Sequence, residues 1–271
     1  MTLLRSLSLA FACLTAPSLA AHEFWIEPHL YQIDAGERLQ ADFKNGETFR
    51  GITLAFFEQS SARFSMMVEG RETEVQPRLG DLPALNVPAP TQDGLVVVVH
   101  ETTSSTVTYN DWQKFLRFVA HKDFPNAARE HLEAGWPKTG FRESYTRHVK
   151  ALVAVGSGAG QDQPAGLKTE FVALSNPYAD GFDNDMRIQL LLDGAPRPDA
   201  QVEVFERSPS GDVRVSLHRT LSDGTAVIPV KSNHTYLFDA VVLNRASEAA
   251  QTAKAPLWQT FWAALTFHVP E

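Results

Sequence analysis

The 271-residue sequence has 24 Lys and Arg against 32 Asp and Glu, and its formal net charge is −8. The acidic balance and the lack of a long basic run argue against a nucleic-acid partner. One cysteine, Cys13, allows no intramolecular disulfide, so packing must stabilise a chain long enough for one large domain or two ordinary ones.

The first 20 residues have the composition of a secretory signal. Arg5 is positive, residues 7–14 are apolar, and residues 18–20 form a small-x-small cleavage site. The apolar run is far shorter than the roughly 20 residues of a transmembrane helix, and no later stretch reaches that length. We therefore expect a signal peptide over residues 1–20 and a soluble mature chain, periplasmic or secreted, without a transmembrane segment. Cleavage after Ala20 and cleavage after Ala21 both fit.

Residues 21–109 have the pattern of an N-terminal β-sandwich domain. Asn45-Gly46 is a hairpin-turn signal between two predicted strands. Residues 94–100 form a continuous apolar run rich in Val, which is typical of a strand covered on both faces. The predicted strands cover residues 21–29, 39–43, 52–57, 64–68 and 94–100.

Residues 110–145 are predicted to be a helical insertion. Asn110 or Asp111 can cap a helix that ends near His121, because apolar residues follow at i, i+3, i+4 and i+7. A second helix is expected from Pro125 to Gly135. We expect a turn over residues 141–145, and then a strand over residues 146–156 that returns to the first sandwich.

A glycine-rich segment, residues 157–166, is predicted to be a linker to a C-terminal immunoglobulin-like β-sandwich over residues 167–271. A polar loop is expected over residues 244–256, before the last strand. The predicted fold is therefore mainly β, with two immunoglobulin-like or prealbumin-like β-sandwich domains and a helical insertion between them. The seven predicted strands of this part cover residues 170–174, 187–192, 201–206, 213–218, 225–230, 235–243 and 263–269.

His22 stands at the predicted new N-terminus. Neutral imidazole is a common ligand for nickel, cobalt, copper and zinc, and a nearby N-terminal amine can join it. If the mature chain starts at Ala21, its amine, a backbone nitrogen and the His22 imidazole could chelate copper or nickel. If the chain starts at His22, the amine and imidazole of one residue could bind copper as a histidine brace.

Further imidazole ligands would have to come from residues around the helical insertion. His100 ends a strand, His121 ends the first helix, His131 lies on the apolar side of the second helix, and His148 follows the predicted turn. No HxH, HxxxH or HExxH spacing is present, and a core or capping role is the alternative for each. The predicted metal ligands are His22, His100, His121, His148 and His131.

Five segments taken in order resemble one known family, domain-of-unknown-function family 4198. They are AHEFWIEP, RESYTRHVKALVAVG, GLKTEFVALSNPY, DGAPRPDAQVEVFER and WAALTFHVP. The family is often associated with nickel or cobalt uptake, including the NikK-type extracytoplasmic component of nickel transporters. The resemblance implies an envelope metal-handling protein with nickel or cobalt as its ion, copper or zinc as alternatives, and an envelope metal transporter as its partner.

Three functions follow as hypotheses. The first is a periplasmic nickel- or cobalt-binding protein that is not an enzyme, since no G-x-S-x-G, P-loop or dinucleotide motif is present. The second is an oxidative copper enzyme with a histidine brace at His22. The third is a structural or adhesive β-sandwich protein without a metal.

Overall fold

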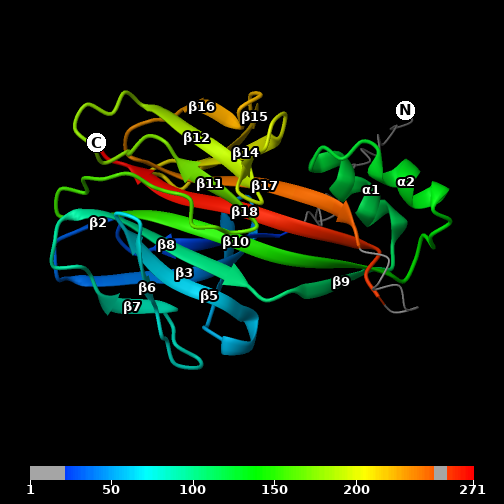
Figure 1. Cartoon of the computed structure of the whole chain (residues 1–271), viewed down its shortest axis with the longest axis horizontal. Coiled ribbons are helices and arrows are strands. Elements are labelled where there is room, and N and C mark those ends of the chain that lie inside the picture. The colour runs from blue at the N-terminus through cyan, green and yellow to red at the C-terminus, as the bar shows by residue number, and fades with distance from the viewer. Residues whose placement is uncertain (1–21, 247–254) are drawn as a thin grey trace, which may run out of the picture.

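A large mixed sheet forms the middle layer of the computed structural model, which describes residues 22–246 and 255–271 (Figure 1). Its strands are β2 (Gln32–Ile33), β5 (Ser61–Val68), β6 (Arg71–Glu74), β8 (Gly94–Thr102), β9 (Ser105–Tyr109), β10 (Phe141–Val155), β14 (Gln201–Arg207), β15 (Val213–Arg219), β17 (His234–Arg245) and β18 (Trp258–Val269). Their order is β15-β14-β17-β18-β10-β8-β5-β6, with β2 and β9 paired to β10. The pairings of β10 with β18 and with β2 are parallel.

Two four-stranded sheets cover the two faces of this central sheet. The first contains β1 (Glu23–Pro28), β3 (Arg38–Glu47), β4 (Arg50–Leu54) and β7 (Leu85–Pro88). The second contains β11 (Thr169–Ala173), β12 (Asp185–Leu192), β13 (Ala195–Pro196) and β16 (Thr225–Pro229). Alternate residues of β8 belong to different cores: Val96 packs in the core of Trp25, whereas Val97 packs in the core of Phe171. The predicted strand covered on both faces is therefore confirmed.

The mainly β, sandwich-like fold is confirmed, and the structure adds a link between its halves. In β10, residues 143–151 pair in parallel with residues 258–266 of β18, so one sheet runs through both predicted sandwiches. The predicted domain boundaries at residues 21–109, 157–166 and 167–271 stay a prediction. Residues 1–20, with the predicted signal peptide, and residues 247–254 of the predicted loop lie outside the described part of the chain.

The predicted turn over residues 141–145 is wrong, because these residues are the first third of β10. They pair with β9 along its whole length, from Phe141 opposite Tyr109 to Tyr145 opposite Ser105. Phe141 stacks on Tyr109 with ring centroids 5.0 Å apart, and Glu143 is buried. The start of this segment has a helix-like spacing in the sequence, which misled the prediction, whereas the burial of Phe141 and Glu143 alternates as in a strand.

The β3–β4 hairpin is present, but Asn45-Gly46 is not its turn. The turn residues are Thr48 and Phe49, whose φ angles of 53° and 57° match the left-handed pair of a two-residue hairpin loop. Phe49 accepts this conformation because its ring is buried edge-on against Trp25, with centroids 5.4 Å apart. Gly46 lies inside β3, where an added Cβ would meet the Arg50 carbonyl oxygen at 2.0 Å.

Two helices pack against one end of the central sheet, beside β17 and β18 (Figure 1). The Asp111 side chain caps α1 (Trp112–His121) by accepting from the Gln113 N–H at 2.9 Å, as predicted. Buried Phe115, Phe118 and Val119 of α1 join an aromatic core that includes Trp258 and Trp262 of β18. The other helices are α2 (Ala127–Glu133) and the 3₁₀ turn η1 (Glu58–Ser60).

None of the helices within residues 22–246 and 255–271 is both long and apolar enough to cross a membrane.

Candidate functional site

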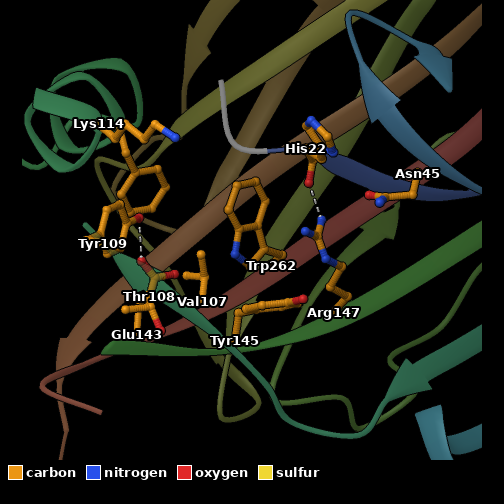
Figure 2. Close-up of a pocket in the computed structure, with 11 residues that line it drawn as sticks. His22, Asn45, Val107, Thr108, Tyr109, Lys114, Glu143, Tyr145, Arg147 and Trp262 are labelled. Carbon is orange, nitrogen blue, oxygen red and sulfur yellow. Dashed lines mark hydrogen bonds between the residues drawn. The ribbon is translucent and has the colours of Figure 1, made fainter. Parts of the chain in front are cut away.

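A cavity of about 290 Å³ opens where α1 and the start of β1 meet the central sheet (Figure 2). β9, β10 and β18 form its floor. It is lined by His22, Asn45, Val107, Thr108, Tyr109, Lys114, Phe118, Glu143, Tyr145, Arg147 and Trp262. We refer to it below as the His22 cavity.

His22 lies at the mouth of this cavity, immediately before β1. Its imidazole is half exposed, and Nε2 is 3.3 Å from Oε1 of Glu47. The antiparallel register that places Glu23 opposite Gly46 brings Glu47, at the end of β3, beside His22. The His22 carbonyl oxygen accepts a hydrogen bond from Nη1 of Arg147. An imidazole nitrogen and a carboxylate oxygen thus lie together at an exposed edge, and both are metal-donor types.

Cationic and aromatic groups dominate the cavity wall. The Arg147 guanidinium lies 4.9 Å from the centroid of the Trp262 ring and 5.2 Å from that of Tyr145, within cation–π range. Lys114 reaches in from α1, and Figure 2 shows Lys114 and Arg147 on either side of Trp262. Glu143 is the carboxyl group of this wall. It accepts from the Tyr109 hydroxyl at 2.8 Å and the Thr260 hydroxyl at 2.6 Å.

A buried charge cluster also contacts Trp262. The Lys122 ammonium, also 4.9 Å from the Trp262 ring, contacts Glu203, Oδ2 of Asp239 at 2.9 Å and Oε1 of Glu23 at 3.8 Å. All four residues are buried. We refer to Glu23, Lys122, Glu203 and Asp239 as the Lys122 cluster.

The pKa values of the carboxyl groups in the Lys122 cluster are shifted by burial and by the charges of their neighbours. Burial, reinforced by Asp239 and Glu203, raises the pKa of Glu23 to about 7 despite the ammonium of Lys122. Burial likewise raises the pKa of Asp239. Although burial opposes it, His121 and Lys122 hold the pKa of Glu203 below its ordinary value. Burial favours the neutral amine of Lys122, but the three carboxylates outweigh this and raise its pKa.

Three predicted histidine ligands are buried with partners of their own. His131 uses both ring nitrogens, since Nδ1 accepts from Trp258 at 3.0 Å and Nε2 is 2.9 Å from the Pro137 carbonyl oxygen. Nδ1 of His148 is 3.2 Å from the Trp262 carbonyl oxygen. His100 lies among phenylalanine rings with Nε2 3.1 Å from the Ser61 hydroxyl, and burial lowers its pKa to about 3.

The fourth predicted ligand of the helical insertion, His121, is half exposed, and its Nε2 lies 2.7 Å from Oε1 of Glu203. Within residues 22–246 and 255–271, no three His, Cys, Asp or Glu side chains are grouped so that they could hold one metal ion. The metal role of His22, His100, His121, His148 and His131 stays a prediction.

The Lys122 cluster and the position of Arg147 in the wall of the cavity were not predicted from the sequence. Glu203 and Asp239 are register partners on adjacent strands, and each interrupts an apolar run. A charged residue at an inward strand position was the available signal, because such a group needs a buried partner. Lys122 carries no such signal, since a lysine at a helix end is ordinary.

Comparison with solved structures gives distant matches. A tetra-tandem repeat in the extending region of a large adhesion protein matches at TM-score 0.23 and 11% identity, covering 91% of this chain and 50% of that chain. The D0-D1 domain of intimin matches at TM-score 0.21 and 11% identity, covering 90% and 97%. Values this low support no conclusion about fold or function.

No curated protein matches the chain. A family model does match: Domain of unknown function (DUF4198), over residues 19–244. This match covers most of the chain and confirms the family that the five sequence segments indicated. The chain belongs to the DUF4198 family.

Proposed function

We propose that this protein binds a nickel or cobalt ion through His22 in the cell envelope and passes it to a metal transporter, without catalysing a reaction. The observation that carries the proposal is the exposed His22 imidazole 3.3 Å from the Glu47 carboxylate, at the mouth of a cavity. The resemblance to metal-uptake proteins of the family supports the choice of ion and partner.

The donor types at His22 suit a divalent transition metal. Imidazole binds nickel, cobalt, copper and zinc, and a carboxylate is an acceptable second ligand. Such ions take about four or more ligands, so the side chains of His22 and Glu47 make an incomplete set. Cleavage after Ala20 would add an amine and a backbone nitrogen, which favour the tetragonal geometry of nickel or copper.

The remaining predicted histidines are less available. Both nitrogens of His131 are engaged, His148 and His100 are buried, and His121 is committed to Glu203. A ligand role for them would require those contacts to break. His22 makes one ion-pair contact, and its side chain is 51% exposed, which leaves it free to bind an ion.

Titration of the secreted protein, its N-terminus defined by intact mass, tests this function. Calorimetry with nickel, cobalt, copper and zinc should show binding tighter than millimolar. His22→Ala should weaken nickel binding by about tenfold or more, since it removes the imidazole ligand. His29→Ala is the matched control, because His29 is also exposed and lies 3.4 Å from a carboxylate, that of Asp42. Equal losses in both variants, or no binding, would contradict the proposal.

The copper-brace alternative makes different demands. It needs His22 as the first residue and a second histidine at the metal. Apart from His22, none of the residues lining the cavity is a histidine. A mature chain that begins at Ala21 would remove the brace and leave nickel or cobalt binding possible, whereas the metal-free adhesive alternative predicts no response to any of the four ions.

A further inference from the structure

We infer that the His22 cavity binds the carboxylate groups of a small organic anion, which reaches the protein as the chelator of its metal ion. The metal part of this inference rests on the proposed function. The anion site has its own support, in the charge, the free hydrogen-bond donors and the size of the cavity beside His22.

The cavity is cationic although the protein is acidic. The formal charge of the chain is −8, yet Lys114 and Arg147 both line this cavity. Glu143 is the acidic residue of the lining, and its two oxygens already accept from Tyr109 and Thr260. A local excess of cations in an acidic protein attracts an anion.

Both cations are uncommitted. Neither Lys114 nor Arg147 forms an ion pair with any residue of the described chain, and the Lys114 ammonium has no hydrogen-bond partner there. Arg147 donates from Nη1 to the His22 carbonyl oxygen, and the other N–H groups of its guanidinium have no hydrogen-bond partner within the same residues.

The aromatic rings of the cavity wall orient the Arg147 guanidinium so that it can bind a carboxylate. The Trp262 and Tyr145 rings hold the guanidinium at 4.9 Å and 5.2 Å, which limits its rotation. A fixed planar guanidinium presents paired N–H donors that match the two oxygens of a carboxylate. The hydrogen bond from Arg147 Nη1 to the His22 carbonyl oxygen places this anion site directly beside the proposed metal ligand. One metal chelate could therefore contact both residues.

The size of the cavity limits the ligand. Its volume of about 290 Å³ is at the lower end of small-molecule sites, which span roughly 300–1,000 Å³. A di- or tricarboxylate is a small ligand that suits a cavity of this volume. A chelating anion of this class would also supply the metal ligands that His22 and Glu47 do not.

Three titrants separate the metal from the anion: nickel chloride, citrate, and preformed nickel–citrate. Wild-type protein should bind nickel–citrate more tightly than either component. Lys114→Ala should weaken binding of citrate and nickel–citrate by about tenfold, the scale of one charge-assisted hydrogen bond, and leave nickel chloride binding unchanged. Arg147→Lys should weaken the same two titrants, because it keeps the charge and loses the fixed fork.

Lys138→Ala is the matched control, since Lys138 is exposed, carries the same charge and does not line the cavity. Equal effects of Lys114→Ala and Lys138→Ala, or no binding of citrate and nickel–citrate, would overturn the anion site. Nickel binding that depends on His22 would then still support the proposed function. Citrate binding that depends on Lys114, with no nickel binding, would uphold the anion site and overturn the metal role.

Discussion

Two lysines are buried among carboxylates in this protein, and they are held in different ways. Lys150, on β10, lies 2.7 Å from Asp162 and 3.5 Å from Glu170. Its ammonium also donates to the Gln163 carbonyl oxygen at 3.2 Å. We refer to Lys150, Asp162 and Glu170 as the Lys150 cluster, which ties the segment after β10 to the central sheet.

Backbone donors complete the Lys150 cluster. Asp162 accepts from the N–H groups of Gln163 and Ala173. Glu170 accepts from three successive residues, Ala165, Gly166 and Leu167. Burial raises the pKa of Asp162, as it does that of Asp239, so burial alone does not distinguish the two clusters. The difference lies in how many fixed N–H donors stabilise each carboxylate.

The Lys122 cluster has less of that support, since Glu23 alone of its carboxylates accepts from a backbone N–H of the described residues, that of Thr48 at 3.2 Å. Glu203 and Asp239 accept no hydrogen bond from a backbone N–H of the described residues, and Oδ1 of Asp239 has no partner among them. Three carboxyl groups share one ammonium here, against two in the Lys150 cluster. We therefore expect the fully bonded Lys150 cluster to serve as a structural link, and the Lys122 cluster, which contacts Trp262 of the His22 cavity, to respond to protons and nearby charge.

Lys122→Met should give the largest effect, a loss of about 3–5 kcal/mol in the free energy of unfolding at pH 8. Removing the ammonium raises the pKa values of Glu23 and Asp239 further, because Lys122 opposes both shifts. Groups with raised pKa values contribute stability below their ordinary values, 3.8 for Asp239 and 4.5 for Glu23, and lose it as pH rises. The loss should therefore shrink toward pH 4.5. Urea unfolding at both pH values measures it, and a cost that is the same at both would contradict this account.

Lys150→Met should cost less, about 2 kcal/mol at pH 8, because five backbone N–H groups still stabilise the two carboxylates. The same unfolding experiment compares it with Lys122→Met. If the Lys150 variant proved the less stable of the two, backbone donors would not explain the difference between the clusters.

Two amide substitutions, one in each cluster, compare the clusters through smaller changes in stability. Asp162→Asn should lose about 1–2 kcal/mol, because its NH₂ group must face Lys150 or a backbone N–H, which are also donors. Asp239→Asn should change stability by less than about 0.5 kcal/mol or increase it at pH 8, since its NH₂ group can donate to the opposite Glu203. Thermal unfolding of both variants at pH 8 decides this, and equal losses would contradict it.

Local sequence patterns predicted most elements of the fold but not how they assemble. Alternation and β-branched runs indicated most of the strands, and the spacing after Asp111 indicated α1, because a few neighbouring residues determine each. The parallel pairing of β10 with β18 joins residues more than a hundred positions apart. No local pattern encodes such a pairing, so the shared central sheet could not be predicted.

The candidate site likewise has one part that local sequence predicted and one part that depends on how the strands assemble. His22 was predicted from a short motif at its own position, and the structure places it beside a cavity. The Lys122 cluster combines β1, the end of α1, β14 and β17. Glu203 and Asp239 meet only because β14 and β17 pair in one register. A shift by one residue would turn either side chain to the opposite face, and sequence alone does not determine that register.

The smallest predicted effect concerns the exposed edge of the Lys122 cluster. His121 is half exposed, and its hydrogen bond to Glu203 raises its pKa above the ordinary 6.5. A histidine with a raised pKa contributes stability that is complete below 6.5 and is lost as pH rises through the folded-state value. His121→Gln should therefore cost less than about 1 kcal/mol at pH 5.5, because solvent screens the pair, and close to nothing at pH 9.

His218→Gln serves as the control, because the pH dependence of its effect on stability should have the opposite sign. Burial lowers the pKa of His218, so its neutral form is favoured and stability is lost as pH falls below 6.5. The stability of the His218→Gln variant relative to wild type should thus be higher at pH 5.5 than at pH 9. A cost of His121→Gln that did not vary with pH would mean that His121 acts through packing, and the Lys122 cluster would then be closed to solvent protons at this edge.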